Sequence, residues 1–199
     1  KNILIKIFIM VSAILLAAGE SKRLKGENKL IKILNKKHLI NHSIKALVRS
    51  KVDKIIVVLG YQSNKVKKLV KKNKKISFIL NKNYKNGMST SIKSGLKKLV
   101  KKEIGFIIVH SDMPYIKSSD INKIYNSIKK RKKLVHVLKY KNKVGNPIGF
   151  DISLINKFKN IKGQFGAKFM VKRLKNETNF IKVSSMKIFK DFDLKKDFN

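Results

Sequence analysis

Residues 11–29 read VSAILLAAGESKRLKGENK. The run Val11–Leu16 is almost entirely apolar, as in a strand that is buried on both faces of a sheet. The small residues Ala17–Gly19 follow it and predict a tight turn, and Arg23 and Lys29 add two spaced cations. A buried strand that runs into such a turn predicts an α/β protein, in which ligands bind beyond the carboxyl ends of the strands.

The same organisation continues along the chain. Short apolar runs rich in β-branched residues alternate with amphipathic stretches, which is typical of βαβ units around a mainly parallel sheet. The predicted strands are Val11–Leu16, Lys54–Leu59, Ile76–Leu80, Gly105–His110 and Leu134–Leu138, with a further strand after Phe180. We therefore expect a three-layer αβα, Rossmann-like fold with a mainly parallel, mixed central sheet.

Helical periodicity identifies two of the stretches between the strands. Ser91–Val100 carries its apolar residues, Val100 among them, on one face. A second helix is predicted from about Ser118 to Lys130, because it begins at a cluster of capping residues, Ser118–Asp120.

The chain has 199 residues, which fits one domain, and a formal net charge of +38. The excess is mostly lysine spread along the whole sequence, and the Lys-rich and Asn-rich segments Val70–Lys75 and Tyr140–Val144 are predicted to be solvated loops. An AT-rich coding sequence would produce this composition, whereas nucleic-acid surfaces usually cluster their charge and add arginine and stacking aromatics. We therefore expect no specific nucleic-acid partner, although the charge would steer anionic substrates toward the protein.

The N-terminal segment imitates a secretory signal, because an apolar run over Ile3–Leu16 is followed by the small residues Ala17–Gly19. The same residues fit a buried first strand better. With Met10 as a natural start, we interpret residues 1–9 as an upstream extension and residues 10–199 as one domain. No other apolar run approaches the ~20 residues that cross a bilayer. Together with the absence of cysteine, which excludes disulfides and thiolate zinc sites, this favours a cytoplasmic protein without a membrane partner.

The loop after the first predicted strand has the chemistry of a phosphate cradle. Small residues let backbone N–H groups approach a phosphate chain, and Arg23 and Lys29 can neutralise its charge. The loop has neither the Gly-Lys-Ser/Thr of the Walker form nor the glycine-rich dinucleotide fingerprint. On the residues alone, a tight connection with no ligand is the alternative explanation for the glycine turn.

Two acidic segments predict a metal site in a chain that has only 11 acidic residues. Asp112 follows the fourth predicted strand and precedes Pro114, so it is well placed to hold Mg²⁺ against substrate phosphates. The segment Asp191-Phe192-Asp193, with Asp197 behind it, could supply a second oxygen ligand. Charge balance is the alternative explanation for this second segment. His110 is expected to orient Asp112.

Five segments stand in one order along the chain: Leu16–Lys29, Asn81–Ile92, His110–Pro114, Gly145-Asn146-Pro147 and Asp191–Asp197. This order resembles the nucleotidyltransferases of the molybdenum cofactor, and the cytidylyltransferase branch more than the guanylyltransferase branch. The resemblance runs from about Val11 to Phe198. Each motif alone is a weak indication of the family, but five motifs in the same order are a specific one.

The resemblance implies a nucleotidyltransferase that joins CTP to the phosphate of a molybdopterin-type cofactor, uses Mg²⁺ and releases pyrophosphate. It implies that a molybdenum hydroxylase apoenzyme could be the partner that receives the product. It assigns catalysis to Lys29, Arg23 and Asp112; nucleotide binding to Ala17, Ala18, Gly19, Glu20, Ser21, Arg23, Lys29, Gly87 and Ser91; acceptor binding to Gly145, Asn146 and Pro147; and the metal to Asp112 and Asp193, with Asp191 as the alternative.

Other functions are also compatible with the sequence. They are a nucleotidyltransferase that uses GTP or a sugar-phosphate or other acceptor, a carrier of the finished molybdenum cofactor, and a basic nucleic-acid-binding domain. The last would explain the charge but not the paired acids. The Ala17–Gly19 opening, in place of a double-glycine form, favours CTP by family likeness. Lys25 replaces a glycine that is usual in the family. Lys29 comes one position later in the loop than the corresponding lysine of the family does.

Overall fold

The computed structural model describes residues 9–24, 26–164 and 166–198. The predicted upstream extension lies outside these residues except for Ile9, as does Lys25 in the phosphate loop. The strands of the main sheet are β1 (Met10–Ala17), β4 (Lys54–Leu59), β5 (Ile76–Leu80), β6 (Glu103–His110), β7 (Val135–Tyr140), β8 (Lys143–Asp151) and β9 (Thr178–Lys182).

These strands form a mixed sheet in the order β5-β4-β1-β6-β8-β7-β9. Strands β5, β4, β1 and β6 pair in parallel, as do β7 and β9. Strand β8 runs antiparallel to both of its neighbours, β6 and β7. The prediction of a mainly parallel, mixed sheet is therefore confirmed.

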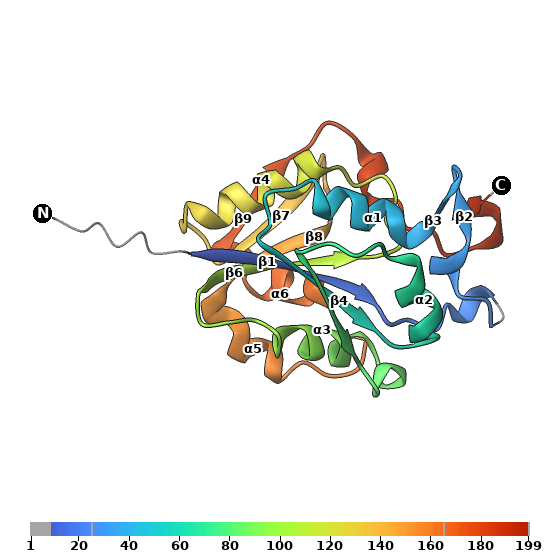
Figure 1. The fold of residues 1–199 in the computed structure, drawn as a ribbon. Coiled ribbons are helices and arrows are strands. Elements are labelled where there is room, and N and C mark those ends of the chain that lie inside the picture. Colours follow the sequence, from blue (N-terminus) through green and yellow to red (C-terminus); the bar gives the residue numbers. More distant parts are fainter. Residues whose placement is uncertain (1–8, 25, 165, 199) are drawn as a thin grey trace, which may run out of the picture.

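Strand β1 is buried on both faces because its side chains alternate between two hydrophobic cores. Val11, Ala13 and Leu15 pack into one core, and Ile14 packs into the other. The helices that cover the sheet are α1 (Leu39–Val48), α2 (Ser63–Leu69), α3 (Met88–Leu96), α4 (Ser118–Lys129), α5 (Ile155–Lys159) and α6 (Ala167–Arg173). Helices α1 and α4 lie on one face of the sheet, and α3 and α5 lie on the other (Figure 1). This arrangement is the expected three-layer αβα fold.

Several predicted elements need correction. Helix α3 begins three residues before the predicted Ser91 and ends at Leu96, so Val100 lies outside it and is 40% exposed. The predicted loop Tyr140–Val144 is the tip of a hairpin, because Tyr140 ends β7 and Lys143 begins β8. Helix α4 begins at Ser118 as predicted, but its N-cap is Lys117, whose N–H donates to the Asp120 carboxylate at 3.1 Å.

A small second sheet, which the sequence did not predict, stands between the phosphate loop and α1. It pairs β2 (Ile33–Leu34) with β3 (Lys37–His38). The ring of His42 lies 2.9 Å from the Leu34 carbonyl oxygen and links this hairpin to α1. In Figure 1 the C-terminal segment lies beside β2 and β3, where the Lys32 ammonium is 5.8 Å from the centre of the Phe198 ring.

His136 lies in the core, and its environment makes a prediction about stability. The side chain is 1% exposed, and its Nδ1 lies 2.7 Å from the Ser127 hydroxyl of α4. Burial lowers the pKa of His136 to about 4. In the unfolded chain the ring titrates at about 6.5. The buried neutral ring therefore contributes its full stabilisation to the native protein above about pH 6.5. This contribution is lost as the pH falls toward the lowered pKa of the folded state.

We expect the free energy of unfolding of the wild-type protein to fall by about 3 kcal/mol more than that of His136→Gln between neutral pH and about pH 4. Urea unfolding of both proteins across this range measures the difference, and other titrating groups cancel in the comparison. An equal pH dependence in the two proteins would contradict a buried neutral ring.

Within the residues that the structure describes, no helix combines the length and the apolar character that a bilayer span requires.

Candidate active site

The carboxyl ends of β1 and β6 open into a cleft of about 520 Å³. The loop after β1, the start of α3 and the C-terminal segment complete its walls. The predicted site residues that line it are Ala18, Gly19, Glu20, Ser21, Arg23, Lys29, Gly87, Ser91, Asp112, Asp191 and Asp193. Ala17 does not line the cleft, because it is the last residue of β1 and packs into the core at 1% exposure.

Local hydrogen bonds position Lys29 at the end of the loop after β1. The Lys29 N–H donates to the Ser21 hydroxyl at 3.1 Å, and Ser21 itself has a positive φ of 54°. Asn28 caps the short 3₁₀ turn Lys29–Ile31 by accepting the Leu30 N–H at 3.0 Å. These contacts hold the Lys29 backbone at the rim of the cleft, so its side chain can extend inward.

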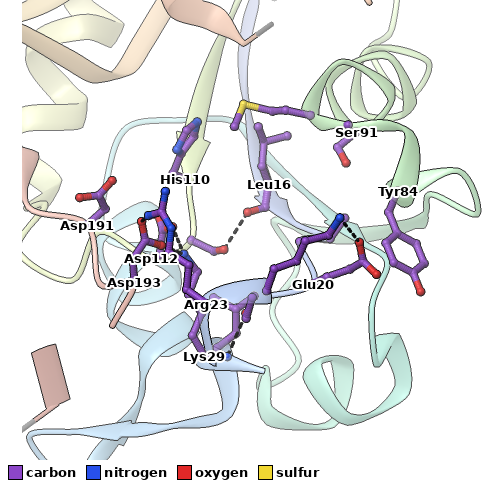
Figure 2. A pocket seen from close by; sticks show the side chains of 18 of the residues that line it. Leu16, Glu20, Arg23, Lys29, Tyr84, Ser91, His110, Asp112, Asp191 and Asp193 are labelled. Atoms are coloured by element: carbon purple, nitrogen blue, oxygen red, sulfur yellow. Dashed lines mark hydrogen bonds and ion pairs between the residues drawn. The ribbon is translucent and has the colours of Figure 1, made fainter. Parts of the chain in front are cut away.

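The Lys29 ammonium lies between two carboxylates from distant parts of the chain. Its Nζ is 2.5 Å from Asp112 Oδ2 and 2.5 Å from Asp193 Oδ1. Arg23 reaches the other oxygen of Asp193, with Nη1 2.7 Å from Oδ2. Figure 2 shows these four side chains gathered on one side of the cleft, across from Ser91 and Tyr84. Lys29 therefore reaches the acidic pair despite its shifted position in the loop.

The C-terminal segment is fastened beside Asp112 by backbone and aromatic contacts. The Phe192 N–H donates to the Asp112 carbonyl oxygen at 3.0 Å. The Phe192 ring is 1% exposed and packs edge-on against Tyr115 and Phe198. Asp197 accepts the Asp193 N–H at 3.0 Å, and Asp197 is not among the residues that line the cleft. Asp197 thus shapes the turn that presents Asp193.

Electrostatics keep the ammonium of Lys29 charged. Burial opposes the charge, but the Asp112 and Asp193 carboxylates outweigh it and raise the pKa of Lys29 above its ordinary value. Lys29 is therefore protonated at neutral pH. It balances two acids that would otherwise repel each other at close range.

The acidic pair also fits a hard divalent cation. Two oxygens that are each 2.5 Å from one nitrogen are separated by at most twice that distance, which one hydrated ion can bridge by direct bonds or through a water ligand. In addition, Asp112 Oδ1 is buried and has no hydrogen-bond partner in the described part of the chain. No cluster of three or more metal-ligating side chains occurs among the described residues, so substrate phosphates and water would have to complete the coordination.

The start of α3 forms the opposite wall of the cleft. Gly87 has a φ of 103°, and a Cβ there would lie 2.4 Å from the Gly163 carbonyl oxygen, so the fold itself requires this glycine. The Ser91 hydroxyl accepts from Asn81 Nδ2 at 3.0 Å, which leaves its own hydrogen available to the cleft. Asn81 had no predicted role of its own, although its place directly after β5 was a usable signal.

A second cavity of about 290 Å³ adjoins the cleft and shares Met88, His110, Gln164 and Asp191 with it. Gly145 and Asn146, which were predicted to bind the acceptor, line this cavity together with Lys143 and Lys168. Pro147 is buried and is not among the residues that line either cavity.

The role predicted for His110 needs correction. Its Nε2 lies 3.1 Å from Asn146 Nδ2, whereas the Asp112 carboxylate is directed to Lys29. Burial lowers the pKa of His110, so the ring is neutral at physiological pH. His110 therefore positions Asn146 of the second cavity. Asn146 Oδ1 is also buried and has no hydrogen-bond partner in the described residues.

Comparison of the sequence with known families gives one match over most of the chain. A family model described as the MobA-like NTP transferase domain matches residues 13–178. A 2-C-methyl-D-erythritol 4-phosphate cytidylyltransferase from Lachnoclostridium phytofermentans is 31% identical over 61% of this chain and 53% of its own length. A probable UDP-N-acetylglucosamine pyrophosphorylase from Acanthamoeba polyphaga mimivirus is 31% identical over 56% of this chain and 45% of its own. The chain thus spans about half the length of these curated relatives.

Solved structures share the fold at low sequence identity. Rv0371c from Mycobacterium tuberculosis H37Rv has a TM-score of 0.83, with 17% identity and 96% of each chain covered. The same protein has been solved in complex with manganese, with a TM-score of 0.79, 16% identity, and coverage of 95% of this chain and 96% of that one.

Proposed function

Because the chain belongs to the MobA-like NTP transferase family, we propose that it is a nucleotidyltransferase that joins a nucleoside triphosphate to a phosphorylated acceptor. The observation that carries this proposal is the meeting of Lys29 and Arg23 with Asp112 and Asp193 in one cleft, beside a glycine loop. Such a site combines cations for phosphate charge with carboxylates for a metal ion.

In the proposed reaction, an oxygen of the acceptor phosphate attacks the α-phosphorus of the nucleotide. The bond from the α-phosphorus to the bridging oxygen breaks, and pyrophosphate leaves with that oxygen. The attacking oxygen is already anionic, so no strong general base is needed. Lys29 and Arg23 would hold the phosphates in line and neutralise the charge that develops on them.

We further propose that Asp112 and Asp193 hold Mg²⁺. Their shared contact with one ammonium and the unpartnered Asp112 Oδ1 support this assignment, as does the manganese complex of the M. tuberculosis neighbour. When bound, the ion would supply Lewis-acid stabilisation of charge on the phosphates. Asp191 faces the second cavity as well as the cleft and has no contact with Lys29 in the described residues, which favours Asp193 as the second ligand.

For the substrates, we propose CTP and a molybdopterin-type phosphate, whose product a molybdenum hydroxylase apoenzyme would receive. Gly87 has no side chain to obstruct the cleft, and the Ser91 hydroxyl can hydrogen-bond to a base, so this wall suits the edge of a pyrimidine. In addition, one curated relative is named a cytidylyltransferase. Lys143 and Lys168 give the second cavity two cations that suit an acceptor phosphate. A sugar-phosphate or polyol-phosphate acceptor is the second candidate, because the names of both curated relatives point to such acceptors.

A pyrophosphate-release assay tests these proposals together. Each of the four NTPs is combined with molybdopterin, with and without molybdenum, and in parallel with methylerythritol 4-phosphate and N-acetylglucosamine 1-phosphate. We expect release only with CTP and molybdopterin. Release with a sugar or polyol phosphate alone would establish the second candidate, and no release with any pair would contradict the transferase.

The base preference provides a separate prediction. We expect CTP to outcompete GTP at equal concentration, and Ser91→Ala to raise the KM for CTP by about fivefold because a hydrogen bond to the base is lost. Steady-state kinetics with both nucleotides measures this. A wild-type preference for GTP would place the chain in the guanylyl branch.

Gly19 provides a prediction about the phosphate loop. A Cβ at Gly19 would meet no heavy atom within 4 Å, so the fold does not need a glycine there. We expect Gly19→Ala to keep the wild-type Tm but to bind nucleotide about tenfold more weakly, because the methyl group occupies the approach to the backbone. Calorimetry measures both quantities. Gly87→Ala serves as the contrast and should lower the Tm, and tight nucleotide binding by Gly19→Ala would exclude the loop as the phosphate site.

A further inference from the structure

The contacts of Lys29 bear on how the proposed cation site fills. Its Nζ occupies the space between Asp112 Oδ2 and Asp193 Oδ1, at 2.5 Å from each. Arg23 takes the remaining oxygen of Asp193 at 2.7 Å. Three of the four oxygens of the acidic pair thus already face a cationic group of this chain.

A divalent ion and this ammonium cannot both occupy the space between the two carboxylates. Mg²⁺ or Mn²⁺ bonds to oxygen at about 2.1 Å, so an ion that bridged the pair would lie in the space of the ammonium. Like charges at such short range also repel strongly. The Lys29 side chain is 15% exposed, so bulk water screens this repulsion poorly.

The same cleft contains a second set of partners for Lys29. The lysine belongs to the segment that carries the glycine loop, and its backbone is bonded to Ser21 of that loop. Phosphates bound at the loop would lie within reach of both Lys29 and Arg23, which line the same cleft. A triphosphate can therefore replace the carboxylates as the counter-ion of both cations.

We propose that Lys29 closes the divalent-cation site until nucleotide phosphates draw its ammonium away, so that the cation enters with the nucleotide or after it. This inference rests on the proposed nucleotidyltransferase function. Lys29 then controls access of the metal ion and also binds phosphate. Arg23 competes more weakly with the ion, because it contacts only one oxygen of Asp193. The protein without nucleotide should then bind divalent cations poorly at a site that contains two suitable carboxylates.

The test is Mn²⁺ binding to the nucleotide-free protein, followed by electron paramagnetic resonance of free Mn²⁺ and by calorimetry. We expect Lys29→Met to bind Mn²⁺ about tenfold more tightly than the wild type or better, within the usual range of coupling between sites. Arg23→Met should give a smaller gain, because it frees only one oxygen. The matched control is Lys22→Met, which removes the same charge from the same cleft but contacts Glu20 at 3.7 Å instead of the acidic pair.

Lys22→Met should therefore bind Mn²⁺ as the wild type does. The double variant Lys29→Met with Asp112→Asn should lose the gained affinity, which locates the ion at the acidic pair. Lys29→Gln keeps hydrogen-bonding groups toward both acids without the charge, and it provides the same comparison if Lys29→Met does not fold. Equal affinities of both Lys29 variants and the wild type, or an equal gain in Lys22→Met, would overturn the gate.

The measurement is independent of which base or acceptor the enzyme uses. Failure of the pyrophosphate-release assay with every substrate would count against the proposed transferase and leave the Mn²⁺ comparison valid. Unchanged Mn²⁺ affinity in an active enzyme would count against the gate alone.

Discussion

Lys29→Ala should lower kcat by about a thousandfold, while the nucleotide dissociation constant rises much less. In the proposed reaction, the ammonium matters most when negative charge builds up on the transferring and leaving phosphates. Its raised pKa keeps it protonated through the whole neutral range, so a pH change near neutrality will not mimic the substitution.

Single-turnover kinetics with saturating nucleotide, together with nucleotide binding by calorimetry, separates the two effects. The matched control is Lys32→Ala, which removes the next lysine of the same turn, and Lys32 pairs with Glu27 at 2.5 Å instead of the acidic pair. This control should retain wild-type kcat. A Lys29→Ala enzyme with normal kcat and a raised KM would reduce Lys29 to a charge that attracts substrate.

Asp112→Asn and Asp193→Asn should each lower Mg²⁺-dependent turnover by about a thousandfold or more, because an amide cannot replace a charged ligand of a hard cation. Both variants should fold, since the two carboxylates lie in the cleft and both side chains are partly exposed. Turnover against Mg²⁺ concentration and circular dichroism spectra test the two expectations.

Asp191→Asn is the matched control for the metal assignment. Asp191 lines the same cleft and is separated from Asp193 only by Phe192, but it also lines the second cavity. We expect this variant to keep the wild-type half-saturating Mg²⁺ concentration, whatever its effect on the acceptor. If Asp191→Asn loses its Mg²⁺ response while Asp193→Asn keeps it, the second ligand is Asp191.

The strands that are easiest to predict are those whose side chains mostly enter a core. Strands β1 and β4 are apolar apart from Ser12 and the exposed Lys54, because both of their faces are covered, and such runs are visible without a structure. Strand β8 was missed because it contains Gly145, Asn146, Pro147 and Gly149, which are poor strand formers. Its pairing with β6 and β7 supplies the stability that its own residues lack, and such pairing leaves no local pattern in the sequence.

For the site, the sequence by itself determined which groups are available: small residues and spaced cations after the first strand, and an acid after the fourth. That much follows from the rule that parallel strands present their carboxyl ends to one edge. Only the tertiary structure decided that Lys29 meets Asp193, which is 164 residues away. The Phe192 N–H bond to the Asp112 carbonyl oxygen and the burial of the Phe192 ring bring the C-terminal acids to the cleft. The buried Phe192 also fixes the directions of the two acids beside it. Asp193 is directed to Lys29, whereas Asp191 lines the second cavity as well as the cleft. Sequence spacing alone carries no information about these directions.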